Sequence, residues 1–464
     1  MKKVIVIGAG ITGLSAAWKL SECGHKAIVI ESEGQIGGLA KSVIIDDYIL
    51  DIGPHSFFSE DKEVYDKIVG LFKEEKSELP FSKRTVKMYF KGKYVDYPLS
   101  VKSILFQTGI LSPILSTLSF IKSYIKTSLN SFKKKNDIDE KNLTIEEWAI
   151  NNFGKYLFLN FFKPYTEQFW KLKTSELSHK VIPSSKKLDF AKTLKHLLVK
   201  KYLEISKREP GKLSLVERES LPSYYPKKGF GEIAKRIGRE VLKNNGEILT
   251  NCKAQEIRIG EKSVEIITNK QNFICDYVIS TIPLNNLIKK FNPKPPDLVL
   301  KCSQELEYLS LVLLYIITKK EDVLNCQYCY FIDRPYNRIS EMNNFSRETS
   351  PKSENLLSVE ISCHYKDETW NLSDQEIYER CIKSIERDEL LKKSDVVNFK
   401  ILRFPSVYPI YKKNYDDNLK EVNKFLDKSK NFYSIGRQGQ FYYGDIDQMA
   451  RFGFDTADKI DINN

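Results

Sequence analysis

The apolar residues at the start of the chain are spaced as expected for a strand, a helix and a second strand. Residues 4–7 are β-prone and apolar, and Gly8 ends this run. Apolar positions with helical spacing follow as far as Gly24, and residues 26–30 form a second short apolar run. Neither run alternates with polar residues, which is typical of strands buried on both faces of a parallel sheet. The pattern therefore predicts a βαβ unit.

Farther along, the character of the pattern changes several times. Residues 76–220 have mainly helical periodicity, and short β-prone runs then return at 246–250, 264–268 and 276–283. A last run, 432–435, ends at Gly436 and precedes a helix. We predict the α/β class, with a discontinuous Rossmann-like dinucleotide-binding domain, a helical substrate domain and a mixed β-sheet substrate domain. The predicted ranges are 1–75, 221–285 and 401–464 for the first, 76–220 for the second and 286–400 for the third.

The turn after the first predicted strand carries Gly8-x-Gly10-x-x-Gly13. In such a motif the first glycine permits a tight turn, the second lets the backbone approach a phosphate, and the third lets the helix pack closely on the strand. The helix N-terminus then faces the pyrophosphate. Glu31 lies at the tip of the second predicted strand, where a carboxylate binds a ribose hydroxyl and disfavours a 2′-phosphate.

A second glycine pair, Gly37-Gly38, follows Glu31 after a few residues. A nicotinamide-binding unit does not need this pair, and the extended motif resembles the long dinucleotide signature of FAD enzymes. We therefore predict FAD as the cofactor, bound by Gly8, Gly10, Gly13, Glu31, Gly37 and Gly38. The alternative is a doubly wound domain whose glycines only shape turns.

Length and charge set limits on the partners. The chain has 464 residues, so we expect two or three domains. Its 73 Lys and Arg residues exceed its 61 Asp and Glu residues, which gives a net charge of +12. This charge suits nucleic acid, an anionic membrane or a phosphorylated substrate, but it is also typical of a lysine-rich solvated surface. Because no nucleic-acid-binding module accompanies the basic run 133–135, we expect no nucleic acid partner.

Cysteines and one uncharged segment bear on the compartment. The eight cysteines are scattered, which favours reduced thiols and a cytoplasmic protein. The one close pair, Cys326 and Cys329, has no second pair or flanking histidine, so we predict core packing and no metal site. Residues 103–121 carry no charge, but polar residues and Pro113 interrupt the run. We expect buried or interfacial helices there, which leaves peripheral membrane contact open.

Several longer motifs resemble the amine-oxidase superfamily of flavoenzymes, and within it UDP-galactopyranose mutase and its protoporphyrinogen-oxidase-like relatives. The resemblance rests on residues 51–58, 89–98, 164–170, 337–339 and the Gly436-Arg437 block. It implies that Gly436, Arg437 and the helix that follows them contact the flavin, where helix N-terminal amides stabilise negative charge.

The resemblance to the mutases implies a reaction without net redox change. In those enzymes N5 of the reduced flavin attacks the anomeric carbon of a nucleotide-activated sugar and expels the nucleoside diphosphate. The sugar ring then opens and recloses. Such chemistry requires a reductant for the flavin, cations for the pyrophosphate and aromatic surfaces for the base.

The resemblance also assigns roles to single residues. Arg338 is similar to the pyrophosphate-binding arginine of the mutases, and Tyr443 to a tyrosine that contacts the substrate phosphate, with Tyr442 as its weaker neighbour. Tyr165 and Trp170 occupy a segment that contacts the uridine in the mutases. The alternatives are a surface salt bridge for Arg338 and core packing for the two aromatic residues.

Two departures from the mutase pattern concern a histidine and an arginine. His55 stands at the position of the flavin-proximal histidine, where it either touches the flavin or stabilises a turn, but Phe58 replaces a second histidine three residues on. This change favours the oxidase-like relatives. The mutases carry an arginine on a mobile loop, and the corresponding residues 182–190 contain none. Lys186 or Lys187 would have to supply that charge, without the bidentate geometry of arginine.

Three functions follow from these motifs. The first is a mutase-like isomerisation of a nucleotide-activated sugar, with Arg338, Tyr443 and Lys186 or Lys187 at the phosphates. The second is an FAD-dependent oxidoreductase of the amine-oxidase or protoporphyrinogen-oxidase type, which takes hydride from an amine, a porphyrinogen-type ring or another lipophilic substrate. The Tyr442-Tyr443 pair and the uncharged segment suit this second function. The third is a flavin-binding scaffold without catalysis.

Overall fold

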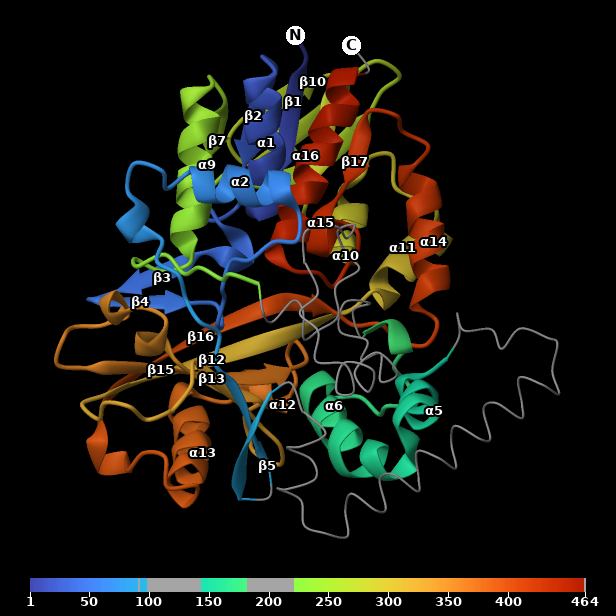
Figure 1. Cartoon of the computed structure of the whole chain (residues 1–464). Coiled ribbons are helices and arrows are strands. Elements are labelled where there is room, and N and C mark those ends of the chain that lie inside the picture. Colours follow the sequence, from blue (N-terminus) through green and yellow to red (C-terminus); the bar gives the residue numbers. More distant parts are fainter. Residues whose placement is uncertain (91, 98–142, 182–220, 463–464) are drawn as a thin grey trace, which may run out of the picture.

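The computed structural model of the chain describes residues 1–90, 92–97, 143–181 and 221–462 (Figure 1). A parallel sheet near the two termini and a larger mixed sheet form its two ends in this view. Lys186, Lys187, the basic run 133–135 and the uncharged segment 103–121 lie outside the described residues. None of the described helices is long and apolar enough to cross a membrane.

The first three predicted elements are β1 (Lys3–Ile7), α1 (Ile11–Glu22) and β2 (Lys26–Ile30). They belong to a five-stranded parallel sheet with the order β17-β11-β1-β2-β7. The other strands are β7 (Glu247–Leu249), β11 (Tyr277–Ser280) and β17 (Phe432–Ser434). Strands from the start, the middle and the end of the chain therefore share one sheet, which confirms the predicted α/β fold with a discontinuous doubly wound part.

Successive residues of β1 face two different apolar clusters. Val4 and Val6 pack in a cluster with the helices α1, α9 (Gly231–Lys243) and α16 (Ile446–Ile462). Ile5 and Ile7 pack in a second cluster with a three-stranded antiparallel sheet. That sheet consists of β8 (Ala254–Ile259), β9 (Val264–Thr268) and β10 (Asn272–Cys275). Because both faces of the parallel sheet are covered, its strands are apolar without alternation.

The larger sheet has seven strands in the order β16-β12-β15-β14-β13-β5-β6. Only the β13–β5 pair is parallel among these neighbours. The strands are β5 (Val86–Phe90), β6 (Lys93–Asp96), β12 (Tyr308–Thr318), β13 (Tyr328–Phe331), β14 (Arg338–Glu341), β15 (Asn355–Cys363) and β16 (Val396–Pro409). Alternate residues of β12 pack toward α13 (Asp374–Arg387) or toward the cluster that contains α1.

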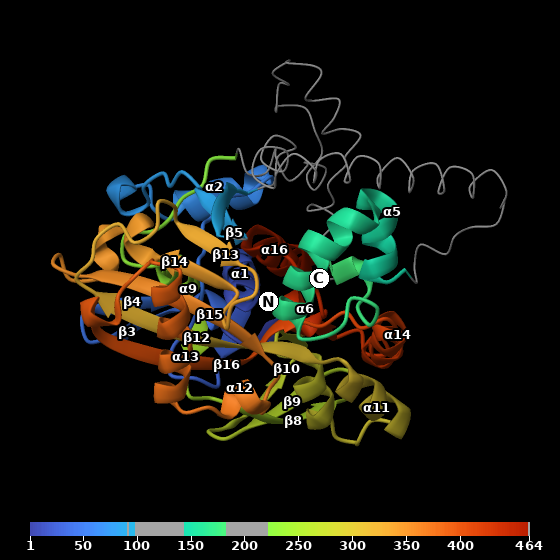
Figure 2. The same ribbon diagram turned by 90° about the horizontal axis from the view of Figure 1, so that it is seen from below.

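The remaining described elements connect or flank these sheets. They are β3 (Ser42–Ile45), β4 (Tyr48–Asp51), α2 (Lys62–Gly70), α5 (Ile145–Leu157), α6 (Lys163–Trp170), α10 (Leu284–Leu287), α11 (Asp297–Glu305), α12 (Glu368–Asn371), α14 (Tyr415–Leu426) and α15 (Gly436–Gly439). Figure 2 shows α5 and α6 next to one another at one side of the molecule. Gln168 of α6 donates hydrogen bonds to the carbonyls of Phe331 and Tyr336, at 3.1 and 2.8 Å, and so fixes α6 against the mixed sheet.

Strand pairing differs from the predicted domain ranges at two places. β5 and β6 lie within the predicted helical range 76–220, yet they form the edge of the seven-stranded sheet. The predicted boundary between residues 400 and 401 falls inside β16, all of which belongs to that sheet. Local periodicity did not show these pairings because the partner strands are distant in the sequence.

Candidate active site

The three motif glycines lie at the tip of β1 and the N-terminus of α1. Each position requires a residue without a side chain, for a different reason. Gly8 has φ +103°, and a Cβ there would lie 2.4 Å from Oγ1 of Thr281. A Cβ on Gly13 would lie 2.1 Å from the carbonyl oxygen of Gly8, so the helix packs on the turn only without a side chain. On Gly10 the nearest described atom would be 4.0 Å away, which leaves open space at the helix N-terminus for a pyrophosphate.

Glu31 lies at the end of β2, and its carboxylate faces the glycine turn. It accepts hydrogen bonds from the backbone N–H groups of Ala9 and Glu33, each at 2.9 Å. The second glycine pair closes the same turn, because Gly37 donates its N–H to the carbonyl of Ala9 at 2.8 Å. Gly38, with φ +55°, approaches Gly10 so closely that a Cβ would lie 3.1 Å from its Cα. The structure thus gathers all six predicted dinucleotide-binding residues of the N-terminal segment.

The C-terminal block returns to the same place. Gly436 has φ +83°, and a Cβ there would lie 2.7 Å from Oγ1 of Thr12, at the start of α1. Arg437 donates a hydrogen bond to the carbonyl of Gly444 at 2.6 Å, and its guanidinium lies over the rings of Tyr408 and Tyr443. These contacts hold the loop before α16 in its conformation.

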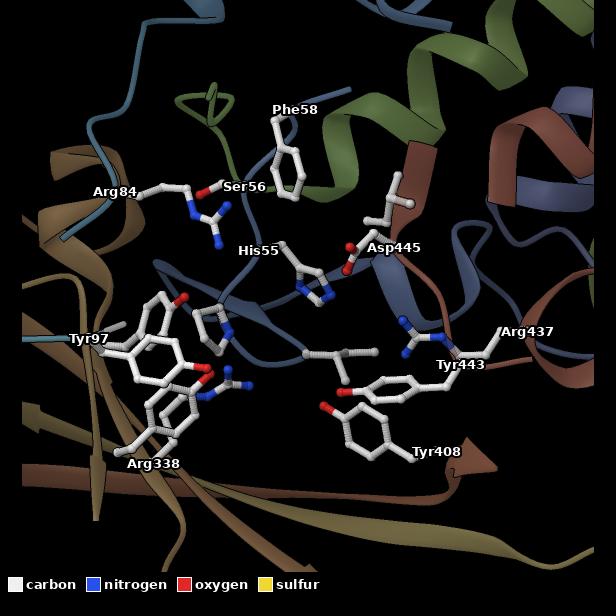
Figure 3. A pocket seen from close by; sticks show the side chains of 15 residues that line it. His55, Ser56, Phe58, Arg84, Tyr97, Arg338, Tyr408, Arg437, Tyr443 and Asp445 are labelled. Carbon is white, nitrogen blue, oxygen red and sulfur yellow. The ribbon is translucent and has the colours of Figure 1, made fainter. Parts of the chain in front are cut away.

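A cavity lies between this block and the seven-stranded sheet, and Figure 3 shows its side chains. Its lining residues are Ile52, Pro54, His55, Ser56, Phe58, Arg84, Tyr97, Tyr328, Tyr330, Arg338, Tyr408, Arg437, Tyr443, Asp445 and Ile446. The three predicted catalytic residues, His55, Arg338 and Tyr443, all line it. The described lining residues include three arginines and one acidic residue, Asp445. This excess of positive charge favours an anionic ligand.

Arg338 forms a bidentate ion pair with the buried carboxylate of Glu360. Its Nε and Nη2 donate to the two carboxylate oxygens, the latter at 2.8 Å. The two residues face one another across the β14–β15 ladder. Burial opposes the charge of Arg338, but Glu360 and Tyr330 outweigh it and hold the pKa of the guanidinium well above its usual value. The surface salt bridge considered as an alternative is therefore wrong, because the pair is buried at the cavity.

His55 lies in the cavity as a neutral imidazole. Burial, with the charges of Arg437 and Arg338, lowers its pKa to about 4. Its Nδ1 lies 3.1 Å from the carbonyl of Gly53, so Nδ1 carries the proton and Nε2 is an acceptor. The ring stacks on Phe230 with a centroid distance of 4.9 Å. The position agrees with both sequence interpretations, since the bond to Gly53 also stabilises the turn.

Asp51, at the end of β4, connects the cavity loop to β3, to the start of α9 and to the seven-stranded sheet. Its carboxylate accepts hydrogen bonds from Ser42, from the hydroxyl of Tyr225 at 2.7 Å and from the N–H of Phe230 at 3.2 Å, next to the start of α9. Its carbonyl accepts one from Tyr315 of β12. Burial raises the pKa of the carboxyl to about 6 despite these donors.

Three predicted substrate-binding aromatic residues lie outside the cavity lining. Trp170 is buried and packs edge-on against Tyr408 and Tyr443, with centroid distances of 6.4 and 6.1 Å. Tyr165 packs edge-on against Tyr330 at 5.6 Å. Tyr442 packs against Phe452 at 5.3 Å. In this arrangement Tyr165 and Trp170 pack against tyrosines of the lining, whereas Tyr442 packs against α16.

Sequence reasoning did not select several residues that line or support the cavity. They are Arg84, Tyr97, Tyr328, Tyr330, Tyr408 and Glu360. Tyr328 and Tyr330 are two residues apart on β13, so they share one face of the strand, and this spacing was a usable signal. The other residues come from strands or loops whose convergence depends on sheet pairing.

Cys326 and Cys329 lie in the apolar core beside α13, as predicted. Among the residues that the structure describes, no three or more His, Cys, Asp or Glu side chains are grouped to hold a metal ion.

A glycine turn at a helix N-terminus, a carboxylate at the next strand tip and a returning C-terminal helix define a flavoprotein of the doubly wound type. The sequence profile described as flavin containing amine oxidoreductase matches residues 11–419. The chain belongs to this family, and FAD is its cofactor. Gly8, Gly10, Gly13 and Glu31 would hold its dinucleotide part, and the flavin would supply redox or nucleophilic chemistry when bound.

Relatives include both reaction types that the sequence suggested. A mitochondrial protoporphyrinogen oxidase of Nicotiana tabacum is 31% identical over 154 residues, which are 33% of this chain and 30% of that protein. A probable UDP-galactopyranose mutase of Klebsiella pneumoniae is 28% identical over 185 residues, which are 39% of this chain and 44% of that protein. The matches thus span less than half of either relative.

Among solved structures, reduced UDP-galactopyranose mutase has a TM-score of 0.79 with 21% identity. The alignment covers 99% of this chain and 95% of that one. This likeness shows that the two proteins share a fold.

Proposed function

We propose that the protein isomerises a nucleotide-activated sugar in the manner of UDP-galactopyranose mutase. Reduced FAD would supply a nucleophilic nitrogen for the anomeric carbon in such a reaction. The bond from that carbon to the phosphate oxygen breaks and later re-forms, and the sugar ring opens and recloses between. No electrons are consumed per turnover, so a reductant is needed only to prime the flavin.

The observation that carries this proposal is the state of Arg338 in the cavity. A guanidinium has five N–H groups, and Glu360 accepts from two of them. The other three have no hydrogen-bond partner among the described residues, so the end of the guanidinium is available to phosphate oxygens. Glu360 holds the group in one orientation, which reduces the entropy lost on binding.

The tyrosines of the cavity suit a sugar nucleotide as well. Burial raises the pKa of Tyr408 to about 12 and that of Tyr330 well above its usual value, so both hydroxyls stay protonated and can donate hydrogen bonds. Their rings offer flat apolar surfaces next to those donors. A ligand with hydroxyls, phosphates and a planar base meets complementary groups here.

A second candidate is an oxidoreductase of the protoporphyrinogen-oxidase type. The sequence match to the Nicotiana tabacum enzyme supports it, and so does Phe58, which adds an apolar surface to the cavity. In that case the arginines would bind carboxylates of a tetrapyrrole. The two candidates differ in redox balance, because an oxidase consumes one equivalent of an electron acceptor per turnover and the isomerase consumes none.

The test begins with the FAD-loaded protein reduced anaerobically by dithionite. UDP-galactopyranose is added, the sugar product is analysed for the furanose form, and the flavin spectrum is followed. We expect furanose to form while the flavin stays reduced, and no turnover with oxidised protein. Absence of product, together with reduction of the flavin of separately prepared oxidised protein by a porphyrinogen or an amine, would assign the oxidoreductase instead.

The role of Arg338 is tested by substitution. Arg338→Ala should weaken UDP binding roughly 10- to 150-fold, as expected for loss of a charge-assisted hydrogen bond. Since that variant leaves Glu360 buried and unpaired, Arg338→Lys is tested beside it, because lysine keeps the charge and loses the fork. Both should reduce binding, and affinity is measured by titration of the reduced protein.

Arg334 provides a matched control. It forms the same bidentate pair with the buried carboxylate of Asp388, but it does not line the cavity. Arg334→Lys should change stability and leave UDP affinity within about twofold, because no phosphate contact is removed. Equal losses of UDP affinity for the two lysine variants would show that Arg338 acts only through the fold.

A further inference from the structure

Arg84 projects into the cavity from a short loop whose backbone is fixed on both sides. Before it, Ser82 donates its N–H to the carbonyl of Ser223 at 2.8 Å, and its hydroxyl accepts from the side chain of Gln327 at 2.6 Å. After it, the carbonyl and hydroxyl of Thr85 both accept from the N–H of Gln327, at 2.9 and 3.0 Å. β5 begins immediately afterwards at Val86 and pairs with β13. The loop therefore presents Arg84 from a defined position.

The side chain of Arg84 lies over the ring of Phe58, with 4.7 Å from its guanidinium carbon to the ring centroid. Both residues line the cavity, and Figure 3 shows the guanidinium pointing toward the space around His55. A planar guanidinium on an aromatic face keeps its N–H groups at its edge, where they can meet an anion. Phe58 thus serves as a platform for the cation.

The other two arginines of the cavity are also held by protein groups. Arg338 is held by Glu360, and Arg437 by the carbonyl of Gly444 and the rings of Tyr408 and Tyr443. Arg84 comes from a different segment and reaches the cavity from the side of Phe58 and Ser56 (Figure 3). A ligand with more than one negative charge can therefore be contacted from two sides.

We propose that Arg84 is a substrate-binding residue that contacts a phosphate of the nucleotide sugar opposite Arg338. This inference rests on the proposed function, and it names a second phosphate-binding cation. It also gives Phe58 a role, as the surface that orients Arg84. Arg84 on Phe58 would supply a second cation at the cavity. Segment 182–190, which corresponds to the arginine-bearing loop of the mutases, carries no arginine.

The test uses the FAD-loaded, reduced protein and UDP as the probe, with Kd measured at low and moderate salt. Arg84→Ala should raise the Kd about tenfold or more and make it less dependent on salt, because a charged contact to phosphate is lost. Arg84→Lys should recover part of the affinity. Phe58→Leu should give a smaller rise, since the charge stays and its platform is lost.

Lys83→Ala is the matched control, because Lys83 is the exposed neighbour of Arg84 and does not line the cavity. Its Kd for UDP should stay within about twofold of the unsubstituted protein, which bounds general electrostatic effects. FAD content and thermal stability are measured for every variant.

The outcomes are distinguishable. If the unsubstituted protein binds and isomerises UDP-galactopyranose while Arg84→Ala binds UDP equally well, the role of Arg84 is wrong and the proposed function stands. If the unsubstituted protein neither binds UDP nor forms furanose, both proposals are wrong. Loss of FAD from Arg84→Ala, without a change in UDP affinity after reloading, would assign Arg84 to the cofactor and overturn its role with substrate.

Discussion

At the tips of the five-stranded parallel sheet, the N-terminal motif residues that fit the dinucleotide lie between Gly8 and Gly38, whereas the cavity beside the seven-stranded sheet draws on residues from Ile52 to Ile446. The first site works mainly through backbone, since Gly10 leaves room for phosphate and the helix N-terminus faces it. The second works through side chains, among them Arg338 and several tyrosines. The glycine motif is therefore local in the sequence, whereas the cavity depends on how distant segments come together.

The two regions also differ in what holds a functional group in place. Glu31 is fixed by backbone N–H groups, those of Ala9 and Glu33. Arg338 is fixed by Glu360, which comes from the adjacent strand. Asp51 joins the two regions, because it binds the N-terminal end of α9 and also accepts from Tyr315 of the seven-stranded sheet. Substitutions can therefore separate cofactor binding, substrate binding and the junction.

The largest effect is expected at the glycine turn. Gly13→Ala places a Cβ against the carbonyl of Gly8, at 2.1 Å before any movement, so α1 cannot keep its position on β1. Such overpacking costs about 1–3 kcal/mol or more, and we expect a lower melting temperature together with little bound FAD. Thermal unfolding and the flavin absorbance of the purified protein measure both effects.

Gly10→Ala is the matched substitution in the same turn. Gly10 has φ −73° and ψ 175°, which alanine adopts freely, and its Cβ would meet no described atom closer than 4.0 Å. We expect the FAD-free protein to keep the stability of the unsubstituted protein, with FAD affinity reduced at least about tenfold by steric conflict with the pyrophosphate. Unchanged FAD affinity would contradict the cofactor role of this turn.

At the junction, Asp51 and His55 should make the free energy of unfolding depend on pH with opposite signs. The pKa of Asp51 is about 6 in the folded chain against an ordinary 3.8, so the folded state binds the proton more tightly. Its contribution should lower the free energy of unfolding by roughly 3 kcal/mol as pH rises from about 4 to 6. His55, with a folded pKa of about 4 against 6.5, should stabilise the fold increasingly as pH rises over that range.

Denaturant unfolding between pH 4 and 7 tests this pair at equal FAD content. Relative to the unsubstituted protein, the free energy of unfolding of Asp51→Asn should rise with pH, and that of His55→Gln should fall. Two difference curves of the same sign would show that the buried groups do not titrate as assigned.

The smallest effect on UDP affinity is expected at Trp170, which packs against tyrosines of the cavity lining. Trp170 packs edge-on against Tyr408 and Tyr443, so Trp170→Phe should cost about 1 kcal/mol of stability through lost aromatic contact. UDP affinity should change much less than in Arg338→Ala. A loss of affinity as large as that of the arginine variant would instead indicate that Trp170 stacks on the base, as the sequence resemblance implied.

Much of the fold could be predicted from local pattern. The motif strands and helix are β1, α1 and β2, and the β-prone run 264–268 is β9. The convergence of His55, Arg338 and Tyr443 on one cavity also agrees with the resemblance. Arg84 and Glu360 could not be found in this way, because no local motif marks them and only strand order brings them to the cavity.

The sequence by itself determined the doubly wound fold and the FAD site, because glycine conformations, a helix N-terminus and a strand-tip carboxylate are set by residues close in the chain. Only the tertiary structure decided which side chains share the cavity and in which charge state. The β14–β15 ladder pairs Arg338 with Glu360, and burial keeps His55 neutral while it raises the pKa of Asp51. Those properties depend on solvent exclusion and on which strands and loops pack together.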